Sequence, residues 1–281
     1  MMKKFYRDLL ICIAINSSLI ANEKKDTWKG NEYAKNSESQ KSSAEDFISA
    51  LKLQDAFVVL DVGCGDGKIT AAMASAIPNG RVIGVDISPS MIEFAKGAFS
   101  NYSNLKFFIQ DAAHIDFQEK FDLITSFTVM QWVLEQQQAL DGFEKTLKPG
   151  GKLCIQMPTG LPVAMDEALT QMLKSKKWKE YFTHFSPPWK FYQPEEYGNL
   201  VANAHLTVNR LDTATKHEKF PSRTVFQGFL RQWFPYLRPL PSDLKDVFLT
   251  ELVDRYLQSL PVDQQGQVSF IVTRLEVEAS K

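Results

Sequence analysis

Phe57-Val-Val-Leu-Asp-Val-Gly-Cys-Gly-Asp-Gly67 is the stretch that decides the fold. It joins a short apolar run to a turn rich in glycine. A run of this kind, closed by glycines, is typical of a strand buried in a parallel sheet. The glycines let the backbone approach a ligand, and a helix that follows presents free N–H groups to it. The stretch therefore predicts a strand, a ligand-binding turn and a helix.

Four more apolar runs follow at intervals too wide for hairpins, at residues 81–87, 105–110, 121–129 and 152–157. Segments with helical spacing separate them, at residues 69–76, 90–99 and 136–147. The helix that precedes this unit is expected over residues 44–53. Alternation of strand and helix predicts right-handed βαβ crossovers and a sheet covered on both faces, which is a doubly wound α/β fold.

The regular alternation of predicted strands and helices ends at residue 160. Residues 161–200 are rich in proline and aromatic side chains, whereas residues 206–213 and 267–277 alternate like strands. Between them, helical spacing covers residues 225–234 and a segment that starts at Ser242. We infer a mostly parallel, seven-stranded sheet, with a C-terminal helical insertion that covers the site.

Composition narrows the classes of function. The chain has 281 residues, of which 44% are hydrophobic and 23% charged, as in ordinary globular proteins. A formal net charge of -1 offers no general attraction to nucleic acid or anionic lipid. The three cysteines and four histidines lack the spacing of metal ligands, so no metal site is expected.

Asp61 separates two kinds of cofactor. A glycine-rich turn also suits nicotinamide dinucleotides, but the third glycine, Gly67, comes one residue too early for the G-x-G-x-x-G spacing. Asp61 stands two residues before Gly63, where it would repel a pyrophosphate and attract an ammonium group. The spacing favours a cofactor with a cationic amino-acid end.

Two further acids follow predicted strands. Asp86 ends the second strand, about 20 residues on, where a carboxylate can bind both ribose hydroxyls. Asp111 follows the third strand and could accept the amino group of adenine, with the N–H of Ala112 on the ring. The alternatives are a solvated acid for Asp86 and a helix cap for Asp111.

Taken together, four motifs resemble the class I S-adenosylmethionine methyltransferases: Leu60-Asp-Val-Gly-Cys-Gly-Asp-Gly67, Gly84-Val-Asp86, Gln110-Asp-Ala112 and Leu147-Lys-Pro-Gly-Gly151. The resemblance covers residues 57–160 and implies a Rossmann-like core that binds S-adenosylmethionine. It further implies that the methionine moiety is held by Asp61, Gly63 and Gly65, the ribose by Asp86, and the adenine by Asp111 and Ala112, with Ile87 and Met91 packed on the adenine.

A narrower resemblance comes from Phe127-Thr-Val-Met-Gln-Trp-Val133. It is similar to the Gln-Trp or His-Trp segment of trans-aconitate, juvenile hormone acid and malonyl-carrier-protein methyltransferases. Tyr33-Ala-Lys-Asn-Ser-Glu-Ser-Gln40 resembles the N-terminal segment of the first group, and residues 223–256 resemble its substrate-covering helices. The N-terminal leader is not part of that pattern, and the match beyond residue 160 is loose. The resemblance implies methyl transfer to the carboxylate of a small or lipid-like acid.

Such a reaction makes modest demands on side chains. A carboxylate arrives deprotonated, so the protein need only align it, exclude water and supply neutral donors. Gln131 and Gln40 offer amides and Trp132 an indole N–H. The alternative for Gln131 is a surface residue, and the alternative for Gln40 is a polar residue at the start of a helix. For Trp132 the alternative is an aromatic residue of the core. The aromatic residues of the insertion suit either helix packing or an acyl-binding wall: Phe226, Phe229, Trp233, Phe234 and Tyr236.

Other functions remain open. Methylation of carbon or oxygen on a quinone-like ring would need a base, for which His114 and His184 are the evident candidates. An NAD-binding oxidoreductase and a non-catalytic cofactor-binding protein are alternatives of another class. No nucleic-acid partner and no stable membrane insertion are expected, and the oligomeric state is left open.

The predicted organisation has four parts. Residues 1–25 form an apolar leader, residues 26–56 substrate-side helices, residues 57–160 the cofactor-binding core, and residues 161–281 the helical cap with the last two strands. The leader resembles a signal peptide, but Leu19 and Ala21 make a poor cleavage site. Because the cofactor is made in the cytosol, we expect a cytoplasmic protein, and export is the alternative if residues 1–21 act as a signal.

Overall fold

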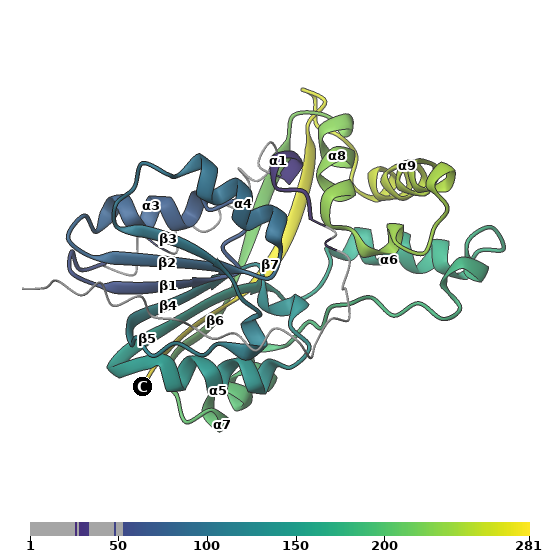
Figure 1. Cartoon of the computed structure of the whole chain (residues 1–281). Coiled ribbons are helices and arrows are strands. Elements are labelled where there is room, and N and C mark those ends of the chain that lie inside the picture. The colour runs from purple at the N-terminus through teal and green to yellow at the C-terminus, as the bar shows by residue number, and fades with distance from the viewer. Residues whose placement is uncertain (1–25, 27, 34–47, 49–52) are drawn as a thin grey trace, which may run out of the picture.

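The computed structural model describes Asp26, residues 28–33, Ile48 and residues 53–281. Within this part of the chain it forms one seven-stranded sheet with the order β3-β2-β1-β4-β5-β7-β6 (Figure 1). Strands β1 to β5 run parallel, and β7 runs antiparallel to β5 and β6. Their bounds are β1 Val58–Val62, β2 Arg81–Asp86, β3 Leu105–Ile109, β4 Phe121–Phe127, β5 Leu147–Pro158, β6 Thr207–Phe220 and β7 Val268–Ser280. The predicted Rossmann-like, mostly parallel sheet is confirmed.

Helices cover both faces of the sheet. α3 (Lys68–Ala76) and α4 (Pro89–Ala98) lie on one face, and α5 (Gln136–Thr146) and α7 (Pro194–Asn203) on the other (Figure 1). Neighbouring residues of β1 enter opposite cores, since Val59 packs with the first pair of helices and Leu60 with the second. Successive side chains of a strand point to opposite faces, so a strand buried on both reads as a continuous apolar run.

A third core lies beyond the parallel strands. It joins α6 (Val163–Lys174), α8 (Arg223–Trp233) and α9 (Ser242–Ser259) to the far ends of β6 and β7. β7 pairs with β5 only as far as Arg274, opposite Pro158, but continues beside β6 to the pair Val268 and Phe220. The two long strands therefore carry α8 and α9, which lie between them in the sequence, past the end of the parallel sheet (Figure 1).

Several boundaries differ from the sequence-based expectation. β6 continues to Phe220 rather than ending near residue 213, and β5 starts at Leu147 because Leu147 pairs with Phe121 across a register shift. The proline-rich region from 161 to 200 contains α6, the short helix η3 (Lys179–Phe182) and the start of α7, which ends at Asn203. The helix expected over residues 44–53 lies outside the described residues, except for Ile48 and Leu53. The leader over residues 1–25 also lies outside them.

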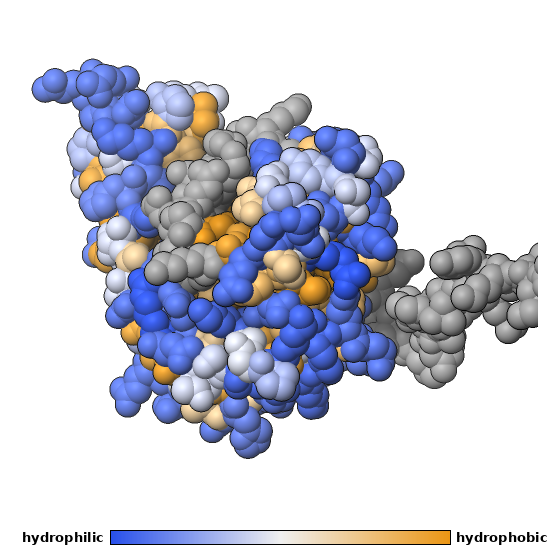
Figure 2. Space-filling model, turned by 90° about the vertical axis from the view of Figure 1, so that its left-hand side faces the viewer, coloured by the Kyte–Doolittle hydropathy of each residue, from blue (hydrophilic) through white to orange (hydrophobic). Residues whose placement is uncertain are grey.

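The surface is mixed in character. Hydrophilic residues cover most of the face shown in Figure 2, and hydrophobic ones gather near its centre. Among the described residues, no helix combines the length and the apolar character needed to cross a bilayer.

Candidate active site

The glycine-rich turn between β1 and α3 adopts the left-handed backbone that its sequence suggests. Gly63, Gly65 and Gly67 have φ values of 75°, 53° and 82°. The N–H of Gly63 donates to the carbonyl oxygen of Val85 (2.7 Å). The N–H of Gly65 donates to Oδ2 of Asp86 (3.0 Å). The turn is thus fastened to the end of β2.

Asp61 lies buried at the end of β1, with 2% of its surface exposed. Its carboxylate accepts hydrogen bonds from the hydroxyls of Thr70 (2.6 Å) and Thr125 (2.9 Å). Burial raises the pKa of Asp61 to about 6, and the two hydroxyls oppose this increase. Two acceptor positions of the carboxylate remain for a further donor, because a carboxylate offers about four.

Asp86 ends β2, in the position that the sequence predicts. Its Oδ1 accepts a hydrogen bond from the N–H of Ser88 (2.9 Å), and burial raises the pKa of the carboxyl. Ile87 is 50% exposed, whereas Met91 is 2% exposed and packs inside. Asp26 accepts a hydrogen bond from the Ser88 hydroxyl (2.9 Å), so Asp26 lies beside this strand end.

Asp111 begins the short helix η1 (Ala112–His114) after β3. Its Oδ1 accepts from the N–H of Ala113 (3.0 Å) and its Oδ2 lies 3.6 Å from Nδ1 of His114. It therefore acts as the helix cap that was the alternative interpretation. Ala112 is buried, and Ile109 at the end of β3 is 55% exposed. Because β1, β2 and β3 are neighbours and parallel, Asp61, Asp86 and Asp111 follow one edge of the sheet.

Gly63→Ala is expected to be more destabilising than Gly150→Ala. Both glycines have a φ near 75°, so alanine is strained at either position, by about 1–2 kcal/mol. A Cβ at Gly63 would also collide with the side chain of Val129, while a Cβ at Gly150 would meet open space. Overpacking adds about 2 kcal/mol to the loss of unfolding free energy. Urea denaturation measures both variants, and equal losses would contradict the close approach of Val129.

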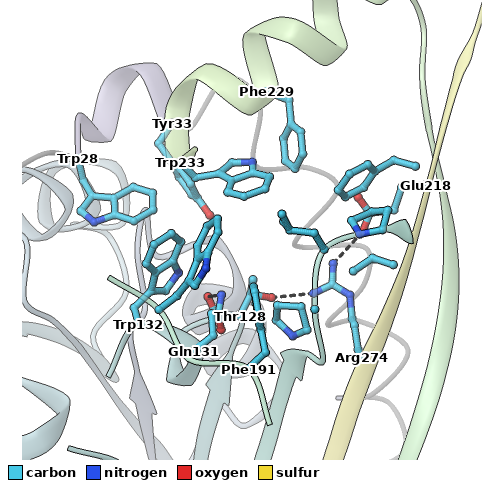
Figure 3. A pocket seen from close by; sticks show the side chains of 17 residues that line it. Trp28, Tyr33, Thr128, Gln131, Trp132, Phe191, Glu218, Phe229, Trp233 and Arg274 are labelled. Atoms are coloured by element: carbon cyan, nitrogen blue, oxygen red, sulfur yellow. Dashed lines mark hydrogen bonds and ion pairs between the residues drawn. The ribbon is translucent and has the colours of Figure 1, made fainter. Parts of the chain in front are cut away.

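A second group of residues forms a pocket between the end of β4, the N-terminal segment and the cap (Figure 3). Nearly half of its described lining residues are aromatic: Trp28, Tyr33, Trp132, Trp189, Phe191, Phe229, Trp233 and Phe270. The ring of Trp132 contacts those of Trp28 and Trp189, with centroids 5.9 Å and 5.2 Å apart. The Gln-Trp segment therefore lies in the wall of this pocket, in the short helix η2 (Met130–Trp132).

Thr128 connects the polar groups of the pocket. It follows β4 with a φ of 59°, an uncommon conformation for a β-branched residue. Its N–H donates to the carbonyl oxygen of Gln156 (2.7 Å). Its Oγ1 accepts from Nη1 of Arg274 (2.8 Å), and its carbonyl oxygen accepts from Nε2 of Gln131 (3.0 Å). Strain of this kind is held by surrounding contacts and is concentrated at functional sites.

Gln131 is buried, with 3% of its surface exposed, and lines the pocket. Its Nε2 keeps one hydrogen after the bond to Thr128, and its Oε1 has no hydrogen-bond partner among the described residues. The alternative interpretation of Gln131 as a surface residue is therefore wrong. Gln40 lies outside the described residues.

Few titratable groups are found among the described residues that line the pocket. Glu218 and Arg274 form an ion pair, Oε1 to Nη2 at 2.7 Å, with side chains 10% and 5% exposed. Burial holds the pKa of Tyr33 well above its usual range, so this side chain is a neutral phenol. Neither His114 nor His184 is among the described residues that line the pocket.

The aromatic set of the insertion contributes to two environments. All five side chains belong to the third core or pack against it, and two of them, Phe229 and Trp233, also line the pocket. The sequence interpretation did not single out Trp28, Trp189, Phe191, Glu218 or Arg274. Tryptophan itself is a signal that could have found two of these, since four of the five tryptophans line this pocket.

The family described as "Methyltransferase domain" matches residues 53–205, more than half of the chain. The chain belongs to this methyltransferase family. It is a class I S-adenosylmethionine-dependent methyltransferase, and S-adenosylmethionine is its cofactor. The alternatives of an NAD-binding oxidoreductase and of a non-catalytic cofactor-binding protein are thereby set aside.

Individual relatives agree with this assignment. Protein 235L of Invertebrate iridescent virus 6, which is named as a methyltransferase, is 27% identical over 229 residues, covering 82% of this chain and 85% of that protein. Trans-aconitate 2-methyltransferase of Variovorax paradoxus is 25% identical over 257 residues, covering 90% and 98%. The crystal structure of mycolic acid cyclopropane synthase CmaA1, in complex with SAH and CTAB, has a TM-score of 0.56 at 15% identity, covering 85% and 81%. The last likeness concerns the fold.

Proposed function

We propose that this methyltransferase transfers methyl to the carboxylate oxygen of a small or lipid-like carboxylic acid, which gives a methyl ester. The observation that carries the proposal is an aromatic-rich pocket whose described lining residues include no free base. Among the described residues that line it, the only carboxylate, Glu218, is paired with Arg274, and Tyr33 is a neutral phenol. A carboxylate acceptor needs no base, whereas a ring carbon or a hydroxyl would lose a proton.

The same proposal assigns the cofactor to the strand ends. Asp61 would receive the ammonium group, Gly63 and Gly65 the methionine backbone, and Asp86 the ribose. The exposed side chains of Ile87 and Ile109 suit the face of adenine, beside Asp111 and Ala112. Met91 would support this surface from beneath, because its own side chain is buried.

When bound, S-adenosylmethionine supplies a sulfonium methyl group: a carboxylate oxygen forms the new C–O bond while the C–S bond breaks, the electron pair stays on sulfur, and no proton is released. The remaining Nε2 hydrogen of Gln131 and the indole N–H of Trp132 would orient the carboxylate. Gln40 is retained as a further amide donor on the basis of its motif. The aromatic walls exclude water from the acceptor.

The proposal also assigns a role to each part of the chain. Residues 57–160 would bind the cofactor, residues 26–56 and 161–281 would enclose the acceptor, and residues 1–25 would form a leader. A small-molecule partner in the cytoplasm fits this arrangement, because the cofactor is made there. The trans-aconitate relatives support a carboxylic acid as the class of acceptor and leave its identity open.

The stability of the product in alkali distinguishes methylation of a carboxylate from methylation of other acceptors. With tritiated cofactor and a panel of carboxylic acids, we expect product whose label becomes volatile as methanol in mild alkali, as esters do. Mass spectrometry would show the added methyl on the acid. Alkali-stable product from every active acceptor would overturn carboxylate methylation.

A hydroxyl acceptor is the second candidate. Oε1 of Gln131, which has no hydrogen-bond partner in the described part of the chain, is a buried acceptor that a hydroxyl could satisfy. Such a reaction would give an alkali-stable methyl ether in the same assay. It would also need a base, which the described walls of the pocket do not offer in free form.

A further inference from the structure

The ion pair in the wall of the pocket has a consequence for the choice of acid. Glu218 and Arg274 are the only charged residues among the described residues that line the pocket. They are also bonded to each other, Oε1 to Nη2 at 2.7 Å (Figure 3). The described walls of the pocket therefore carry no net charge.

The sheet fixes this pair in place. Phe270, Val272 and Arg274 alternate along β7 and line the pocket, as period-two spacing requires. Glu218 lies opposite Phe270 in the antiparallel ladder, so its side chain emerges on the same face as the guanidinium. Arg274 is held from the other side by Thr128 at 2.8 Å.

A neutralised guanidinium is a poor partner for a second carboxylate. The reacting carboxylate brings one negative charge, which Gln131 and Trp132 meet with neutral donors. Another carboxylate on the same acceptor would have to be buried among aromatic rings beside a cation that Glu218 already pairs. An unpaired charge in such surroundings is strongly disfavoured.

We propose that Glu218 neutralises Arg274 in the acceptor pocket and thereby restricts the enzyme to acids with one carboxylate on an apolar body. This inference rests on the carboxylate acceptor proposed above. The proposed restriction distinguishes this enzyme from methyltransferases that act on tricarboxylates such as trans-aconitate, although relatives are named trans-aconitate 2-methyltransferase. Glu218 is in this role a specificity residue that acts through Arg274.

The test compares octanoic acid, octanedioic acid and trans-aconitic acid on the full chain. Four tryptophans line the pocket, so quenching of their fluorescence reports acid binding independently of methyl transfer. We expect the wild type to bind octanoic acid at least about tenfold more tightly than either polyacid, and to show the same order in kcat/KM. Equal or tighter binding of octanedioic or trans-aconitic acid would overturn the inference.

Variants make the role of the pair explicit. Glu218→Gln leaves Arg274 unpaired and is expected to shift the binding ratio toward octanedioic acid by about tenfold. Glu278→Gln is the matched control, because Glu278 of β7 pairs with Arg210 of β6 across the same ladder, and neither residue is among the described residues that line the pocket. An unshifted ratio in folded Glu218→Gln would contradict the inference. Should this variant fail to fold, Arg274→Gln serves instead: Glu218 then loses the guanidinium that neutralises it and is expected to weaken octanoic acid binding about tenfold, and unchanged binding would refute its role.

The two proposals can fail separately. If no acid yields an alkali-labile methyl product, carboxylate methylation is wrong, whatever the fluorescence titrations show. If esters form from polyacids as readily as from octanoic acid, the reaction stands and the restriction to one carboxylate is wrong.

Discussion

Asp61→Asn is expected to weaken binding of S-adenosylhomocysteine by about 100-fold near neutral pH, because a buried carboxylate that faces an ammonium group is replaced by a neutral amide. S-adenosylhomocysteine carries the same amino-acid end as the cofactor and has no methyl to transfer. Isothermal calorimetry therefore measures binding alone.

The pH dependence provides an independent check. Burial raises the pKa of Asp61 to about 6, above its usual 3.8, so folding favours the protonated carboxyl. The stability gained from protonation is fully present below the ordinary pKa and is lost as the pH rises through about 6. The ammonium group needs the ionised form, so affinity is expected to rise between about pH 5 and 7 and then level off. In Asp61→Asn this rise should be absent.

Thr125→Val is the matched control for Asp61. It removes one hydroxyl that Asp61 accepts from (2.9 Å) but leaves the carboxylate in place. We expect its affinity for S-adenosylhomocysteine to stay within about threefold of the wild type, with a lower melting temperature. If Asp61→Asn behaves in the same way, the carboxylate serves only to tie β1 to α3 and β4.

The fold of residues 57–160 could be predicted because local sequence patterns indicate its strands and its glycine-rich turn. Val59 and Leu60 enter opposite cores, so their strand needs apolar residues at every position, which is visible in the sequence. Gly63 must be glycine because of its φ and the nearness of Val129. The role of Asp111 was less determined, since a helix cap and an adenine contact ask for the same residue type.

The acceptor pocket could be predicted only in part. Gln131 and Trp132 are neighbours in a motif, whereas Glu218 and Arg274 are 56 residues apart and meet through the β6–β7 ladder. The part of β6 that carries Glu218 is polar and half exposed, so no alternation of apolar residues indicates a strand there. Trp189 lies in an irregular segment, where no periodic pattern shows the direction of a side chain.

Gln131→Leu is expected to lower kcat by about 100-fold while leaving the dissociation constant of S-adenosylhomocysteine unchanged. Leucine fills a similar volume, but it removes the amide that would align the acceptor and leaves the carbonyl oxygen of Thr128 without its 3.0 Å bond. A misplaced carboxylate loses rate because displacement at the methyl group requires an in-line approach. Steady-state kinetics with the best acid of the panel measures the effect.

Two variants separate alignment from packing in this prediction. Gln138→Leu makes the same change at an exposed glutamine of α5 and is expected to leave kcat unaltered. Trp132→Phe keeps an aromatic ring between Trp28 and Trp189 but removes the indole N–H together with one of the two fused rings, so a loss of about tenfold in kcat is expected. Wild-type kcat in both Gln131→Leu and Trp132→Phe would mean that these residues merely line the pocket. In that case the alignment of the acceptor would have to come from groups other than the Gln-Trp segment.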